Sequence, residues 1–206
     1  MRVLSFFKML ILGLLSIAIV PTAAANEAPA VYAQCIACHG DNGQGNTALS
    51  SPAIAGLSES YITRQLNNYA SGKRGQHPED VSGQQMVMIS KPLDLNKDVP
   101  ALAHYIANLP QVKAVSQVSG DLKNGSRYYH AKCGACHGGQ AQGNKSFNAP
   151  KLAGQHSSYL SKQMRYFSSG VRGTHADDKL GRQMAMMAKT VNEKELKDIL
   201  FFISQQ

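Results

Sequence analysis

Four stretches of the chain place apolar residues at the spacing of an amphipathic helix. Residues 59–70 and 157–168 show this pattern, and each stretch is followed by Ser-Gly, which is typical of a helix C-terminus. Residues 99–109 and 193–204 show it again, and Asn192 with Glu195 predicts a capping box at the start of the last stretch. No stretch alternates apolar and polar residues long enough for a strand. The pattern therefore predicts an all-α fold with long loops.

The chain contains a tandem duplication. Residues 35–93 align with residues 133–191 at a constant offset of 98 without gaps, and the matches include Gln44-Gly45-Asn46 with Gln142-Gly143-Asn144. The alignment predicts a domain at 26–109, a linker at 110–120 and a second domain at 121–206. We also expect both lead-in segments, 26–34 and 121–132, to form helices. The first has Val31 where the second has Tyr129.

The N-terminus has the features of a secretion signal at residues 1–25. Arg2 and Lys8 precede an apolar run over residues 9–20, and Ala23-Ala24-Ala25 offers a cleavage site before Asn26. The run is short for a membrane span of about 20 residues. We expect export to the periplasm, with a retained anchor or a loose membrane association as alternatives.

Each repeat begins with Cys-x-x-Cys-His, the attachment motif of c-type haem. Two thiols at this spacing add across the two vinyl groups of one haem, and the adjacent histidine binds the iron. The motifs predict two covalent haems. Their cysteines are Cys35, Cys38, Cys133 and Cys136, and their iron-binding histidines are His39 and His137. The alternatives are a redox dithiol, which needs a βαβ context, a four-thiolate zinc site and disulfides.

The second iron ligand should recur at the same offset as the first. Met86 pairs with Met184, and Met88 pairs equally well with Met186, so the duplication alone leaves the choice open. We place these methionines on loops between helices. His77 and His175 also recur and offer bis-histidine ligation as an alternative. His104, His130 and His156 have no histidine counterpart and are weak candidates.

Three further repeated pairs have roles available near a haem. The carbonyl of Pro52 or Pro150 could accept the Nδ1–H of the iron-binding histidine. Arg74 and Arg172 could bind propionates through their guanidinium forks, with an exposed surface charge as the alternative. Tyr61 and Tyr159 could bind a propionate, contribute to the domain contact or serve as core aromatics.

The formal charge of the chain is +8 at pH 7. Loss of Arg2 and Lys8 with the signal leaves +6, and four haem propionates and two ferric irons bring the mature protein to about +4. A basic balance can indicate nucleic acid binding, but export and haem argue against it. The surplus is better suited to steering an acidic redox partner.

These motifs resemble those of dihaem cytochromes c of the cytochrome c4 family. The resemblance rests on the two Cys-x-x-Cys-His sites, on Pro52-Ala53-Ile54-Ala55-Gly56 and Pro150-Lys151-Leu152-Ala153-Gly154, and on the Tyr-x-x-(Arg/Lys)-Gln helix that follows each. It implies two class I cytochrome c domains related by a pseudo-two-fold axis, with propionates near the interface and His/Met ligands. The family's methionine lies about seven residues before Val191, which selects Met184 and therefore Met86; counting from Leu95 would select Met88.

The sequence thus indicates an electron carrier rather than an enzyme. Met ligation raises the reduction potential, which suits transfer toward a terminal oxidase, with redox proteins such as an oxidase or a quinol–cytochrome c reductase as partners and no small-molecule substrate required. One alternative is the cytochrome subunit of a larger, flavocytochrome-type complex. The other is a dihaem peroxidase, which needs one haem without a fixed sixth ligand.

Overall fold

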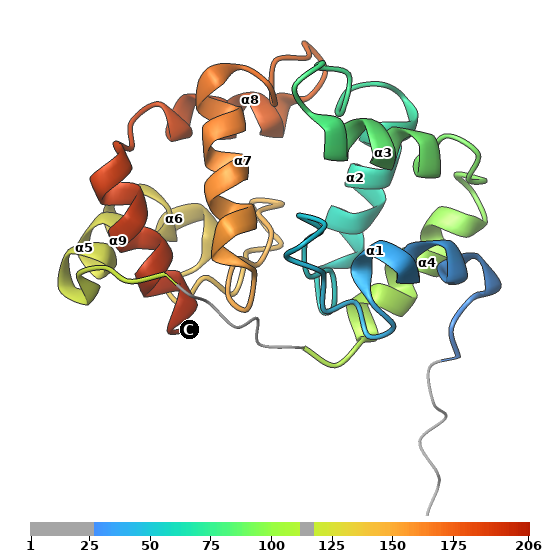
Figure 1. Ribbon diagram of the computed structural model, residues 1–206, viewed down its shortest axis with the longest axis horizontal. Coiled ribbons are helices and arrows are strands. Elements are labelled where there is room, and N and C mark those ends of the chain that lie inside the picture. Colours follow the sequence, from blue (N-terminus) through green and yellow to red (C-terminus); the bar gives the residue numbers. More distant parts are fainter. Residues whose placement is uncertain (1–26, 112–117) are drawn as a thin grey trace, which may run out of the picture.

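The computed structural model describes residues 27–111 and 118–206 and shows two helical lobes side by side (Figure 1). The first lobe comprises the 3-10 turn η1 (Ala30–Tyr32) and the helices α1 (Ala33–His39), α2 (Glu59–Ala70), α3 (Val81–Ser90) and α4 (Asp98–Asn108). The second comprises α5 (Leu122–Lys132), α6 (Gly134–His137), α7 (Ser157–Ser169), α8 (Lys179–Ala188) and α9 (Glu193–Ser204). The described part of the chain has isolated β-bridges but no strand, so the all-α prediction is confirmed.

Two predicted segments fall on residues without a described structure. The signal peptide, 1–25, lies wholly outside the described residues, and so does the central part of the linker, 112–117. Across the segments that are described, no helix has the length and apolar character needed to cross a membrane.

The amphipathic helices form close to the predicted bounds. Helices α2 and α9 match them, α7 is one residue longer, and α4 lies one residue earlier. The capping box at α9 is present: the Asn192 side chain accepts from the Glu195 N–H at 2.9 Å, and the Glu195 carboxylate accepts from the Asn192 N–H at 3.2 Å. Local apolar spacing and capping chemistry were therefore sufficient to place these helices.

The lead-in to the first Cys-x-x-Cys-His differs from the expectation. It enters as the turn η1, and Tyr32, not Val31, corresponds to Tyr129. The Tyr32 hydroxyl donates to the Gly40 carbonyl at 3.1 Å, and the Tyr129 hydroxyl donates to the Gly138 carbonyl at 2.7 Å. In the first lobe α1 runs unbroken from Ala33 through the motif, whereas in the second lobe Cys133, at φ −123° and ψ −40°, interrupts the helix between α5 and α6, and one more residue lies between the tyrosine and the first cysteine. The gap-free offset therefore fails upstream of the cysteines.

Each lobe has its own hydrophobic core. In the first lobe α4 packs on α2 and η1 around Val99, Leu102 and Ile106. In the second lobe α9 packs on α5 and α7, and Gly125 lets α5 and α9 come close together. A Cβ atom at Gly125 would lie 2.1 Å from the Asp198 carbonyl oxygen. The closing helix of each lobe thus holds the helix that leads to its cysteine motif.

Candidate functional site

The two cysteine motifs lie at equivalent helix ends. Cys35 and Cys38 lie in α1, and Cys133 and Cys136 border or lie in α6. Burial raises the pKa of Cys35 and of Cys133 to about 11, while Cys38 and Cys136 are exposed. None of the four forms a disulfide within the described residues. Within residues 27–111 and 118–206, no group of three or more His, Cys, Asp and Glu side chains could hold a metal ion, which argues against a four-thiolate zinc site.

Each motif ends in a buried histidine whose ring is held by a proline carbonyl. The His39 Nδ1 donates to the Pro52 carbonyl at 3.0 Å, and the His137 Nδ1 donates to the Pro150 carbonyl at 2.8 Å. Burial lowers the pKa of both histidines, and the carbonyl contact offsets this only in part. Each ring is therefore neutral with Nδ1 engaged, which leaves the Nε2 lone pair for a metal.

The repeated methionines lie on helices, so their expected placement on loops is wrong. Met86 and Met88 belong to α3, and Met184 and Met186 belong to α8. Asp80 and Asp178 are the N-caps of these two helices. Each side chain accepts a hydrogen bond from a glycine N–H in the first turn at 2.9 Å, which favours a helix over a loop.

The helical placement separates the two methionines of each pair. At about 100° per residue, Met86 lies about 40° around α3 from Ser90, which is fully buried against the lobe, whereas Met88 lies about 160° away and is 68% exposed. Met184 and Met186 have the same positions relative to the buried Ala188. The position on the helix favours Met86 and Met184 as iron ligands over Met88 and Met186.

The other histidines have local partners. His77 and His175 lie in the turns before α3 and α8, where each Nδ1 accepts a backbone N–H two residues ahead at 3.2 Å. His104 pairs with Glu59, and His130 bonds the Ser126 carbonyl. The backbone contacts of His77 and His175 give both residues the same role in a turn, which explains why they recur.

Helices α2 and α7 lie at the boundary between the lobes (Figure 1). A reciprocal cluster of arginines and glutamines joins the lobes there. Arg74 donates to Gln65 at 2.6 Å and across the interface to Gln163 at 3.1 Å. Arg172 donates to Gln163 and across the interface to Gln65 at 3.1 Å. The interchange of equivalent residues is what a pseudo-two-fold axis produces. Arg74 is only 7% exposed, so the alternative interpretation of Arg74 as an exposed surface charge is wrong.

This cluster lacks a counter-charge among its described contacts. Its hydrogen-bond acceptors are neutral, and the Nε atoms of Arg74 and Arg172 are buried without a partner. A buried guanidinium needs an anion or further acceptors. The propionates of haem supply carboxylates of this kind, so the residues present at the interface fit the group that the cysteine motifs predict.

The two tyrosines of the repeat belong to this interface. The Tyr159 hydroxyl accepts from Arg74 at 3.3 Å across the domain boundary. Burial raises the pKa of Tyr61, but the charges of Arg172 and Arg74 outweigh it, so the net shift is downward. Of the roles considered for these tyrosines, the domain contact is the one that the structure shows for Tyr159.

Sequence reasoning missed three interface residues. The Gln155 side chain forms a pair of buried hydrogen bonds with the backbone of Ala53, at 2.9 Å and 2.7 Å, and His156 donates from Nε2 to the Gln44 carbonyl at 3.0 Å. Gln163 recurs as the counterpart of Gln65, but the sequence pattern assigns it no contact. The recurrence of Gln65 as Gln163 beside the arginines was the available signal, whereas Gln155 and His156 have no counterpart that could have revealed them.

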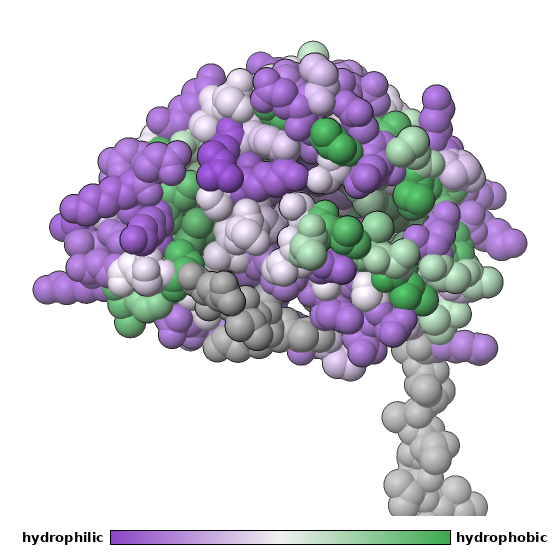
Figure 2. Space-filling model, in the orientation of Figure 1, coloured by the Kyte–Doolittle hydropathy of each residue, from purple (hydrophilic) through white to green (hydrophobic). Residues whose placement is uncertain are grey.

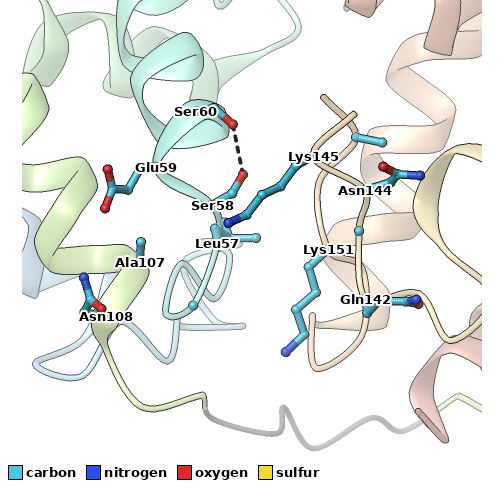
Figure 3. Close-up of a pocket in the computed structure, with 13 residues that line it drawn as sticks. Leu57, Ser58, Glu59, Ser60, Ala107, Asn108, Gln142, Asn144, Lys145 and Lys151 are labelled. Atoms are coloured by element: carbon cyan, nitrogen blue, oxygen red, sulfur yellow. Dashed lines mark hydrogen bonds between the residues drawn. The ribbon is translucent and has the colours of Figure 1, made fainter. Parts of the chain in front are cut away.

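A pocket of about 770 Å³ opens between the lobes on another side of the interface (Figure 3). Its walls are the start of α2 with the end of α4, and the loop 142–151 of the second lobe. Lys145 points across it toward Ser58 (Figure 3). None of the predicted haem-site residues lines this pocket, so we assign it no part in haem binding.

The chain matches the Cytochrome c family over residues 25–110 and 122–206. It is 30% identical over 162 residues to cytochrome c4 of Azotobacter vinelandii, covering 74% of this chain and 76% of that protein. It is 34% identical over 155 residues to a thiosulfate dehydrogenase electron acceptor of Thiomonas intermedia, covering 70% of this chain and 67% of that protein.

The fold agrees with this assignment. Cytochrome c4 of Acidithiobacillus ferrooxidans superposes with a TM-score of 0.69 at 26% identity, covering 85% of this chain and 99% of that one. The two tandem matches and the paired cysteine motifs mean that the chain carries two covalent c-type haems. The chain belongs to the cytochrome c family, as a two-domain dihaem electron-transfer protein of the cytochrome c4 type.

Proposed function

We propose that this chain is a periplasmic electron carrier, not an enzyme, that passes electrons through two His/Met-ligated haems toward a terminal oxidase. The observation that supports this most is the equivalence of the two sites. Each has a histidine held by a proline carbonyl and a methionine beside the buried stripe of its own helix. A peroxidase needs one site that differs by an open or displaceable ligand position.

The haem supplies reversible one-electron chemistry when bound, and the chain sets its conditions. Pro52 and Pro150 fix the ring and tautomer of the ligating histidines, which raises their basicity. Met86 and Met184 complete saturated His/Met sites, which raise the potential relative to bis-histidine sites. Arg74 and Arg172 hold positive charge between the lobes, where propionates can meet it.

The near-infrared absorption of the oxidised holoprotein, quantified per haem, tests the ligand set. A methionine sulfur bound to ferric iron gives a charge-transfer band that histidine ligation does not give. Two equivalents per chain are expected. One equivalent would mean that the sites have diverged and would favour the peroxidase, and none would overturn Met86 and Met184 and promote His77 and His175.

Export to the periplasm is tested by finding the cell fraction that contains the protein and by identifying its first residue. We expect it in the periplasmic fraction with Asn26 as its first residue. Recovery of the chain with residues 1–25 in the membrane fraction would show a retained anchor.

A second candidate function is that of the dedicated acceptor in a larger redox complex. It is favoured by the relative from Thiomonas intermedia, a thiosulfate dehydrogenase electron acceptor. Reduction of the oxidised holoprotein by thiosulfate dehydrogenase with thiosulfate, compared with reduction by a quinol–cytochrome c reductase, separates the two donors. Co-purification of a dehydrogenase with this chain would support the complex over the free carrier.

A further inference from the structure

The two lobes carry opposite charge. Residues 27–111 contain five Lys and Arg against seven Asp and Glu, a net charge of −2, and residues 118–206 contain thirteen against six, a net charge of +7. Both lobes bind the same cofactor, so haem does not account for the difference. An uneven field of this size orients a charged partner toward one lobe.

Part of the excess lies on the outer face of α8. Lys179, Arg182 and Met186 lie between about 120° and 180° around the helix from the buried Ala188, and Lys189 follows at the helix end at about 100°. All four are exposed, and Met186 is 63% exposed. An apolar methionine with a basic rim is therefore presented on the side of α8 that faces away from the lobe.

The equivalent face of α3 provides an internal comparison. Val81 stands where α8 has Lys179, Gln84 stands where it has Arg182, and Met88 matches Met186. Val81 is 61% exposed and Met88 is 68% exposed. The acidic residue before each helix is shared, as Glu79 and Asp177. The duplicated face has a methionine in both lobes and a lysine at its end in both, Lys91 and Lys189, whereas the cations Lys179 and Arg182 are present only in the second lobe.

We propose that the outer face of α8, formed by Lys179, Arg182, Met186 and Lys189, is the docking surface for an acidic redox protein, which exchanges electrons with the second haem. This inference rests on the proposed function. An apolar centre inside a charged rim is the usual anatomy of a protein interface, and the rim chiefly sets the rate of association.

The position of this face suits electron transfer. Met184, the expected iron ligand, lies on the same helix about 160° from Arg182. A partner docked on α8 is therefore separated from the iron-binding side by one helix, about 10 Å across.

Figure 2 shows more hydrophobic surface over the first lobe, on the right, and a more hydrophilic surface over the second, on the left. The two lobes thus offer different surfaces to different partners.

The test uses the oxidised holoprotein and reduced cytochrome b5, a small acidic haem protein, as the probe. Stopped-flow absorbance gives the second-order rate constant. Lys179→Val with Arg182→Gln converts the face of α8 to that of α3, and we expect the rate to fall about tenfold at low ionic strength. The difference should shrink at about 0.15 M salt, where the Debye length is about 8 Å.

A control with the same loss of charge is available on α9. Lys194→Gln with Lys197→Gln removes two exposed cations from the same lobe and should slow the reaction much less. Methyl-labelled methionine resonances locate the contact: Met186 should shift on titration with the probe, and Met88 should not.

An equal effect of the α9 control, or a shift of Met88 in place of Met186, would overturn the docking surface. The proposed function would survive that result, because it depends on two haems that each accept one electron. Reductive titration of the same samples with dithionite measures those two equivalents independently of any protein partner.

Discussion

Arg74 of the first lobe and Gln163 of the second share a hydrogen bond of 3.1 Å at the centre of the domain interface. Arg172 and Gln65 repeat it with the lobes exchanged, also at 3.1 Å. Each glutamine oxygen accepts from both arginines. The interface is therefore built around two like charges that neutral acceptors hold together, and carboxylates beside them would offset their repulsion.

Loss of either shared acceptor should weaken the holoprotein. Gln163→Leu leaves donors of both arginines unpaired in a buried site, and we expect the free energy of unfolding to fall by about 1–3 kcal/mol. Gln65→Leu should cost a similar amount because the cluster is reciprocal. Denaturant unfolding followed by haem absorbance measures both. The control is Gln85→Leu, at an exposed position on α3; equal midpoints for Gln163→Leu and this control would contradict the prediction.

The methionine assignment predicts a selective spectral loss. Met86→Ala and Met184→Ala should each remove half of the near-infrared band, because each removes one sulfur ligand. Met88→Ala and Met186→Ala should leave the band at full intensity, since these side chains lie on the opposite side of their helices. A half-intensity band in Met88→Ala would transfer the assignment in the first lobe to Met88.

Tyr32 and Tyr129 should be energetically equivalent. Each hydroxyl donates to the carbonyl of the glycine that follows the histidine of the Cys-x-x-Cys-His motif, and burial raises the pKa of Tyr32 to about 12. Tyr32→Phe and Tyr129→Phe should each lower the free energy of unfolding by about 1 kcal/mol. Tyr128→Phe, which removes a contact of an exposed arginine, serves as the control. A negligible loss of unfolding free energy in Tyr32→Phe would show that Tyr32 is not the energetic equivalent of Tyr129.

Glu195 should contribute stability that depends on pH. The hydrogen bond from Lys132 at 2.6 Å, followed by that from the Asn192 N–H, holds the pKa of Glu195 below its ordinary value. Folding then favours the ionised carboxylate, so the contribution is present above the ordinary pKa and is lost as pH falls through the lowered one. Glu195→Gln should melt below the wild type at pH 7, and the gap should close below about pH 4.

The neighbouring carboxylate provides the comparison for that experiment. Glu193→Gln removes an exposed acid from the same first turn of α9. Its melting difference from the wild type should not follow the acid-dependent course of Glu195→Gln. A gap for Glu195→Gln that persists unchanged into acid would assign the effect to packing instead of ionisation.

Features encoded in a few consecutive residues were predictable without the fold. The Cys-x-x-Cys-His motifs identified both haems, and apolar spacing with the Asn192 cap placed α9 at its observed bounds. The proline carbonyls were found because His39 and Pro52 recur at one separation in both repeats. The prediction that the methionines lie on loops was wrong because it did not take into account the two aspartate caps that begin these helices.

The duplication, the two haem attachment sites, the helical class and the pair of methionines in each repeat could all be predicted from the amino-acid sequence, because each depends on local spacing or on comparison of one repeat with the other. The fold was needed to show that Tyr32 and not Val31 corresponds to Tyr129, that Met86 and Met88 lie on opposite sides of α3, and that Arg74 reaches Gln163. Those relationships depend on how helices rotate and meet, and Arg74 and Gln163 are 89 residues apart in the chain. Contacts between such distant groups are set by packing and burial of whole elements, which no local pattern specifies.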